Sequence, residues 1–247
     1  WNLNGTAISG ATANTYIANA SGNYTVTVTN NNGCSATSAA TVVTVNALPT
    51  VLAITGTTSV CVGSSTTLAD ATTGGTWSSS NTAIATVNAS TGAVTGVSAG
   101  TVTITYTVTN ANGCTNTATA SVTVNALPTP TISANGSTTF CAGNSVVLTA
   151  SSASTYQWNK NGVAISGATS ATYTATTAGN YTVTVSNANG CTATSAATTV
   201  FVNSLPTATI TAGGSTTVCA GGSVSLSATS GTGYTYQWSN GSGDQTI

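Results

Sequence analysis

The sequence contains almost no ionisable side chains. Among 247 residues there is one basic residue, Lys160, and there are two acidic residues, Asp70 and Asp244; Glu, Arg and His are absent. General acid-base catalysis needs a titratable group beside the substrate, and nucleophilic sites of the Ser-His-Asp or Cys-His type need histidine. We therefore expect no catalytic residues, and we expect that the chain is not an enzyme.

The same shortage removes several classes of ligand. Calcium prefers several carboxylate oxygens, zinc prefers four Cys or His ligands, and nucleic acids need Lys and Arg against their phosphates. We expect no metal site, no cofactor and no nucleic-acid partner. Apolar residues make up 40% of the chain, but they alternate with polar ones instead of forming the run of about 20 that a membrane helix needs. We therefore expect a chain that does not span a membrane.

What the sequence does contain is repetition. The segment Val45-Asn46-Ala47-Leu48-Pro49 returns at 124–128 and, as Val-Asn-Ser-Leu-Pro, at 202–206. The position numbers of the three prolines differ by 128 − 49 = 79 and by 206 − 128 = 78. A nearly constant period of this length is typical of one small domain in a tandem array. We therefore predict two complete domains, 50–128 and 129–206.

Incomplete domains are expected on both sides of these two. Trp1 lies 49 − 1 = 48 positions before Pro49, and Trp158 lies 206 − 158 = 48 positions before Pro206. Residues 1–49 are therefore predicted to be the C-terminal part of a domain, and residues 207–247 the N-terminal part of another. Half a sandwich leaves an open sheet edge, so we expect the missing halves to come from more of the same polypeptide or from an adjoining subunit.

Within the third repeat, residues 129–206, apolar and polar residues alternate with the period of a β-strand, between turns rich in Gly and Asn. The Asn-Gly pair at 189–190 favours a hairpin. No helical period is present. The strands predicted from the alternation are 131–134, 145–150, 155–159, 171–175, 180–186 and 191–202.

About seven short strands with a tryptophan on the third are typical of an immunoglobulin-like sandwich. Trp158 and the segment Ala178-Gly179-Asn180-Tyr181-Thr182-Val183 resemble the third-strand tryptophan and the tyrosine corner of that family, with Val183 in place of its second core cysteine. The predicted fold class is all-β, with tandem immunoglobulin-like β-sandwiches arranged end to end. We expect Trp77, Trp158 and Tyr181 in the cores; the alternative is that the tryptophans form a sugar-stacking face.

The second repeat carries a more specific resemblance. It lies in the segments Trp77-Ser78-Ser79-Ser80-Asn81, 84–87, 91–97 and 99–104. These resemble the bacterial immunoglobulin-like group 2 family of invasin- and intimin-type surface proteins, which implies an extracellular stalk or adhesive module. The whole pattern is similar to the tandem repeats of large surface adhesins of the Bacteroidetes.

The six cysteines fall two to each complete repeat and one to each incomplete one, which favours disulfides in an oxidising, exported setting. One arrangement closes each domain on itself, Cys61 with Cys114 and Cys141 with Cys191. Cys141 is expected at the turn between the first two strands, and Cys191 at the start of the last strand. These two turns lie at opposite poles of a sandwich, on the order of 30 Å apart, whereas bonded cysteines need Cα atoms within about 7 Å. We therefore prefer an inter-domain bond between Cys61 and Cys191. Free thiols are the third alternative.

These expectations converge on a structural or adhesive segment of an exported bacterial cell-surface fibre or giant repeat adhesin. The alternatives are a spacer stalk of a larger secreted enzyme or carbohydrate-binding protein, and a sugar-binding module. The expected partners are neighbouring repeats of the same polypeptide, with self-association in a fibre because a net charge of −1 opposes association only weakly. A surface or glycan ligand stays unknown.

Overall fold

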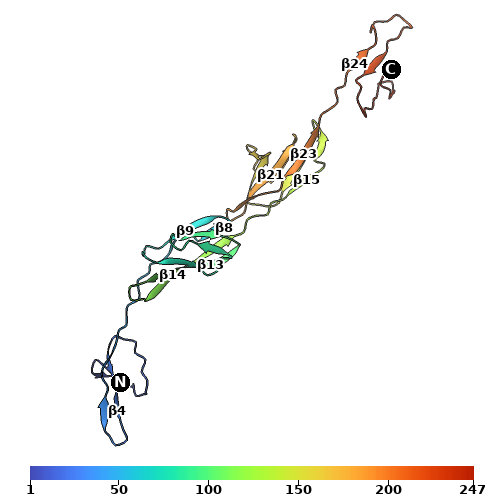
Figure 1. The fold of residues 1–247 in the computed structure, drawn as a ribbon. Coiled ribbons are helices and arrows are strands. Elements are labelled where there is room, and N and C mark those ends of the chain that lie inside the picture. Colours follow the sequence, from blue (N-terminus) through green and yellow to red (C-terminus); the bar gives the residue numbers. More distant parts are fainter. The chain divides into compact units, whose positions relative to one another are not determined.

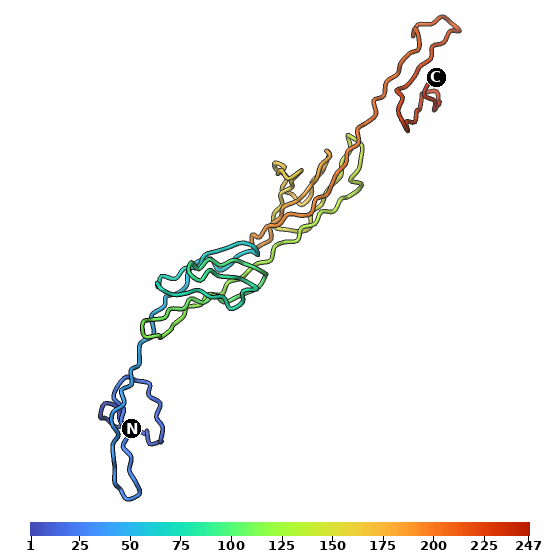
Figure 2. The backbone as a smooth tube through the Cα atoms, in the orientation of Figure 1, coloured from blue at the N-terminus to red at the C-terminus, as the bar shows by residue number.

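The computed structural model describes residues 1–247 and consists of strands and connecting loops without any helix. Figure 1 labels the main strands, and Figure 2 follows the backbone through them. The chain divides into two compact units, Trp1–Leu127 and Pro128–Ile247. Each unit contains a two-sheet sandwich and a smaller set of strands. The predicted all-β fold class of tandem immunoglobulin-like domains is confirmed.

Residues 1–49 form one four-stranded sheet and one hairpin. The sheet has the order β2-β1-β3-β6, and β4 pairs with β5. Tyr24 on β3 is buried, whereas every residue of the two hairpin strands is exposed. The strands are β1 Asn2–Leu3, β2 Thr6–Ala7, β3 Gly22–Thr25, β4 Thr27–Thr29, β5 Ser35–Thr37 and β6 Thr41–Val43.

The second repeat is a sandwich of two four-stranded sheets. One sheet has the order β10-β13-β14-β8 and the other β11-β12-β9-β7. The long strand β13 pairs over its whole length with residues 115–124 of β14. The bounds are β7 Thr55–Gly56, β8 Ser59–Cys61, β9 Ser65–Ala69, β10 Thr76–Ser79, β11 Ala85–Val87, β12 Ala93–Gly96, β13 Gly100–Thr109 and β14 Thr115–Asn125.

Strict alternation along β13 builds the core of this sandwich. Val102, Ile104, Tyr106 and Val108 are buried, and the threonines between them face outward, as expected for a sheet with one wet face. Trp77 packs on Tyr106 with ring centroids 4.7 Å apart. The core residues of this sandwich, partly buried ones included, fall between residues 51 and 124.

The third repeat is also a two-sheet sandwich. Its sheets have the orders β15-β17-β20 and β16-β23-β21-β18-β19, and β22 pairs with β21 at one end. The core residues fall between residues 132 and 202. The bounds are β15 Ile132–Asn135, β16 Thr139–Cys141, β17 Val146–Ala150, β18 Thr155–Lys160, β19 Val163–Ala164, β20 Thr172–Ala175, β21 Gly179–Ser186, β22 Thr192–Thr194 and β23 Thr198–Asn203.

Three aromatic rings form a row through the third core. Tyr173 lies between Trp158 and Tyr181, with centroid distances of 5.9 and 5.7 Å. Trp158 is fully buried and donates its indole N–H to the Ser170 carbonyl at 2.9 Å. The Tyr181 hydroxyl donates to the Thr177 carbonyl four residues upstream at 2.8 Å, which is the hydrogen bond that defines a tyrosine corner.

The predicted last strand, 191–202, is wrong as one continuous element. The structure breaks it into β22 and β23 at Ser195. The Ser195 hydroxyl accepts the Val183 N–H at 3.1 Å and donates to the Ala196 carbonyl at 2.9 Å, while the Ser195 N–H bonds the Val183 carbonyl. The side chain thus takes over one rung of the ladder, which lets the strand bend as at a bulge.

Two short strands of the third repeat, β16 and β19, were not predicted. Cys141 was expected in the turn between the first two strands, but it ends β16, which pairs in parallel with β23. The reason is tertiary: Phe140 packs against the core and holds this segment on the sheet opposite β15. The segment therefore belongs to a strand that changes sheets.

The last segment, 207–247, holds two paired strands, β24 Ile210–Ala212 and β25 Leu226–Ala228, and a bridge between Ser227 and Thr246. Trp238 lies here in a Tyr-Gln-Trp sequence that repeats Tyr156-Gln157-Trp158. This segment contains no strands that correspond to β20, β21 and β23 of the third repeat.

Candidate functional site: the junction between repeats

The ionisable residues do not assemble into a reactive site. Lys160 donates to the Thr177 hydroxyl at 2.7 Å, and one oxygen of Asp70 accepts the Thr72 N–H at 2.7 Å while the other is buried without a partner. No group of three or more His, Cys, Asp or Glu residues gathers anywhere in the structure. The structure also contains no helical segment that could span a membrane. The local structures that recur from repeat to repeat are those around the cysteines.

The second cysteine of each repeat closes a hairpin of fixed construction. In the second repeat the side-chain oxygen of Asn110 accepts the N–H groups of Asn112 and Cys114 at 3.1 and 3.0 Å, and the Asn110 N–H donates to the Cys114 carbonyl at 3.0 Å. Gly113 takes a φ of 78°, which favours glycine. The same bonds form from Asn30 to Cys34 and from Asn187 to Cys191.

The first cysteine of each complete repeat lies beside the asparagine of the linker motif that ends that repeat. Cys61 on β8 is the register partner of Asn125, the last residue of β14. Cys141 on β16 is likewise the register partner of Asn203, the last residue of β23. Both pairings are parallel, and neighbouring strands lie about 4.8 Å apart. The first cysteine therefore marks the pole at which the chain leaves the sandwich.

The hairpin of the second repeat holds the linker that precedes it. The Asn110 side-chain amide donates to the Ala47 carbonyl at 2.8 Å, and the Asn116 amide donates to the Pro49 carbonyl at 2.9 Å. The Cys114 sulfur lies 3.8 Å from the Asn46 carbonyl oxygen. Sequence reasoning missed these roles of Asn110 and Asn116, because asparagine is expected in any turn and so carries no distinguishing signal.

The strand register also argues against the two disulfides that would close each domain on itself. Cys114 precedes β14 and Cys61 faces its last residue, so eleven residues of strand, about 37 Å at 3.4 Å each, separate the two. Bonded cysteines need Cα atoms within about 7 Å. Cys114 and Cys141 carry free thiols, as do Cys34 and Cys219. The bonds Cys61 with Cys114 and Cys141 with Cys191 are therefore not formed in the structure.

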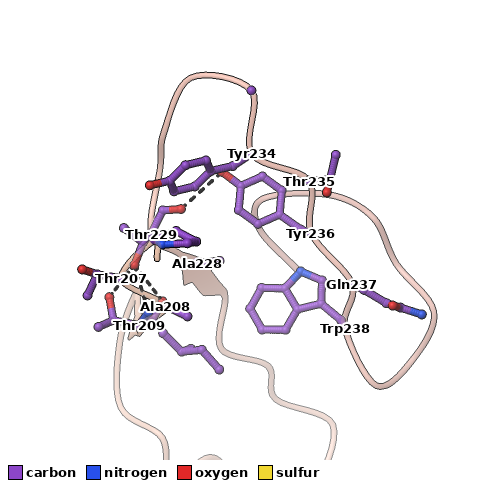
Figure 3. A pocket seen from close by; sticks show the side chains of 13 residues that line it. Thr207, Ala208, Thr209, Ala228, Thr229, Tyr234, Thr235, Tyr236, Gln237 and Trp238 are labelled. Atoms are coloured by element: carbon purple, nitrogen blue, oxygen red, sulfur yellow. Dashed lines mark hydrogen bonds between the residues drawn. The ribbon is translucent and has the colours of Figure 1, made fainter. Parts of the chain in front are cut away.

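The tryptophans of the complete repeats offer no binding face. Trp77 is 7% exposed and Trp158 is fully buried, and Tyr181 is fully buried as well. A recess of about 570 Å³ is lined by residues of the last segment, including Tyr234, Tyr236 and Trp238 (Figure 3). Trp238 stands in the same Tyr-Gln-Trp sequence as the core residue Trp158.

A comparison with protein families finds one match. Residues 39–120 match the bacterial Ig-like domain (group 2) family. The matched segment begins ahead of Pro49 and covers most of the second repeat. No curated protein matches the chain. The family match agrees with the two-sheet sandwich that these residues form.

A search of solved structures finds several proteins that are similar to parts of this chain. Murine CEACAM1b is 14% identical over 61% of this chain and all of that chain, with a TM-score of 0.31. The fibronectin(III)-like modules of Clostridium thermocellum CbhA are 14% identical over 61% of this chain and 94% of that chain, with a TM-score of 0.32. A Ca2+-stabilized, ice-binding adhesin of an Antarctic bacterium is 20% identical over 84% of this chain and 64% of that chain, with a TM-score of 0.32.

Proposed function

We propose that this chain is a structural and adhesive segment of an exported bacterial cell-surface fibre or giant repeat adhesin. The observation that carries the proposal is the parallel pairing of an early strand with the last strand in both complete sandwiches, β8 with β14 and β16 with β23. In this role the protein performs no reaction. It provides reach and transmits force.

Parallel pairing of these strands resists tension efficiently. When a sandwich is pulled at its N- and C-terminal ends, the two strands of each pair are drawn along their length in opposite directions. The hydrogen bonds of the pair are then loaded together rather than one after another. In the second repeat they include Thr123 N–H to Thr58 and Val62 N–H to Asn125; in the third, Phe201 N–H to Thr138 and Ala142 N–H to Asn203, all at 2.8 to 3.0 Å.

The composition supports an extracellular setting for this role. Two cysteines in each complete repeat suit an oxidising compartment, and the matched family is bacterial. A net charge of −1 on 247 residues gives little repulsion between copies. The partners that we propose are therefore neighbouring repeats of the same polypeptide and further copies in a fibre.

The proposal can be tested on the bacterium that makes the protein. We expect antibodies raised against this chain to label intact cells, and an in-frame deletion of residues 50–206 to shorten the rupture distance in single-cell force measurements. A matched control replaces these residues with two unrelated sandwich domains of similar length. Labelling that appears only after permeabilisation would contradict the proposal. Normal attachment combined with loss of a surface enzyme or sugar-binding activity would favour a spacer stalk.

A further inference from the structure

We propose that consecutive repeats are stapled by a disulfide that joins the first cysteine of one repeat to the hairpin cysteine of the next. Within this chain the staple is Cys61 with Cys191. The proposal rests on the proposed function in one respect, because an oxidising compartment is needed for the bond to form and persist. Three observations on the two compact units carry it.

The first observation is the position of Cys61 at the exit of its own repeat. Cys61 is the register partner of Asn125, and Asn125 belongs to the linker motif Val124-Asn125-Ala126-Leu127-Pro128. Parallel strands bring such partners to within about 5 Å. The third repeat repeats this placement with Cys141 and Asn203. Each first cysteine thus lies beside the linker asparagine of its own repeat.

The second observation concerns the hairpin that follows a linker. At the linker before the second repeat, the Cys114 sulfur lies 3.8 Å from the carbonyl oxygen of Asn46, and Asn110 bonds the next linker residue, Ala47. Asn46 is the equivalent of Asn125 in the repeated motif. The hairpin cysteine of a repeat therefore contacts the linker asparagine of the repeat before it.

Together these placements assign the pair. The hairpin from Asn187 to Cys191 has the same hydrogen bonds as the hairpin from Asn110 to Cys114. If it holds the linker at 124–128 as its counterpart holds the linker at 45–49, then Cys191 meets Asn125. Since Cys61 is the register partner of Asn125, the two cysteines come within the span of a disulfide.

The third observation is the state of the other cysteines. The rule that links each first cysteine to the next hairpin cysteine pairs only Cys61 and Cys191 within residues 1–247. It leaves out four cysteines, and these are the four that carry free thiols: Cys34, Cys114, Cys141 and Cys219.

The chemistry is thiol-disulfide exchange with an external disulfide as the oxidant. One thiolate attacks the oxidant and forms a mixed disulfide, and the second thiolate displaces the remaining half of the oxidant. Two thiols of the protein lose two electrons and two protons, and the oxidant leaves as two thiols. The product closes a covalent loop from Cys61 to Cys191 that contains the linker at 124–128.

Peptide mapping tests the pairing. The purified chain is equilibrated with a glutathione redox buffer and alkylated without reduction. It is then digested with chymotrypsin and pepsin, because a single lysine makes trypsin unsuitable. We expect one linked peptide pair containing Cys61 and Cys191, with Cys114 and Cys141 alkylated. In Cys191→Ser we expect Cys61 to become alkylated, and Cys114→Ser serves as the matched control that leaves the linked pair intact. Linked Cys61 with Cys114, linked Cys141 with Cys191, or complete alkylation of Cys61 in the oxidised chain would each overturn the proposal.

Single-molecule stretching gives a second readout. A staple keeps the segment between Cys61 and Cys191 from extending, so reduction should increase the final contour length by about 45 nm, at about 3.5 Å per residue. The Cys114→Ser variant should show the same gain, and Cys191→Ser should show none. Equal contour lengths before and after reduction of the unmodified chain would overturn the staple. Both measurements use purified protein, so they stay informative if the surface location is wrong.

Discussion

Replacement of Ser195 by alanine should destabilise the third repeat by about 1 to 3 kcal/mol, the cost of a buried donor without a partner. Ser195 is 8% exposed, and its hydroxyl is the acceptor for the Val183 N–H at 3.1 Å. Val183 itself is fully buried at the centre of β21. Removing the hydroxyl leaves that N–H unsatisfied. At about 1.4 kcal/mol for each factor of ten, the equilibrium for opening this region should rise about 5- to 150-fold.

Amide hydrogen exchange followed by NMR is the assay, because it resolves the third repeat from the rest of the chain. We expect faster exchange in β18 and β21, with no change in β13 and β14 of the second repeat. Ser133→Ala is the matched control, since that hydroxyl is exposed and donates a long hydrogen bond of 3.4 Å to the Thr149 carbonyl. Equal protection in Ser195→Ala and Ser133→Ala would refute the role given to the Ser195 hydroxyl.

Two further predictions concern single positions in the sandwiches. The pKa of Tyr173 is raised above its ordinary value of 10.0, mainly by burial and secondly by the charge of Tyr181. The fold therefore favours the neutral phenol. The stability that this provides is fully present below about pH 10 and is lost as the pH rises through the folded-state pKa. Alkaline unfolding followed by circular dichroism should start at higher pH in Tyr173→Phe, and an unchanged profile would contradict this. Placing alanine in a left-handed backbone conformation costs roughly 1 to 2 kcal/mol. Gly92→Ala should destabilise the second repeat by clearly more than this, because the new Cβ would also collide with the Leu68 carbonyl and the Trp77 ring. Gly113→Ala, with a similar φ of 78° and open space, is the control, and equal losses of thermal stability in the two variants would show that crowding is not the cause.

Sequence reasoning was sufficient for the elements that local patterns determine. Alternation predicted six strands of the third repeat, and five of them lie close to their observed bounds. The hairpin predicted at the Asn-Gly pair 189–190 forms, although only Gly190 takes a positive φ and Asn189 does not. Trp158 and Tyr181 lie in the core, where a tyrosine corner fixes the second of them. In these cases one face of a strand or one turn contains all the information.

The elements that sequence reasoning missed depend on partners far along the chain. Strand β16 is very short, and it forms because β23, the last strand of the same sandwich, offers a free edge. The break at Ser195 depends on Val183 across the sheet. In the second repeat the corresponding strand, β14, runs unbroken from Thr115 to Asn125 and has no serine at that place. A serine in a threonine-rich strand carries no local sign that its hydroxyl will replace a backbone bond.

For the cysteines, one local prediction was wrong, but the conclusion that the two cysteines of a repeat lie at opposite poles of the sandwich does not depend on it. Cys141 was expected in a turn and lies in a strand, yet either placement puts it at the pole opposite the hairpin of its own repeat, because the last strands of the sandwich separate the two. What the sequence could not supply was the neighbour at that pole. The register of Cys61 with Asn125, and the contact of Cys114 with Asn46, identify the linker asparagine as the residue that both kinds of cysteine approach. Both placements lie within the unit Trp1–Leu127, and the proposed staple extends them to the linker at 124–128.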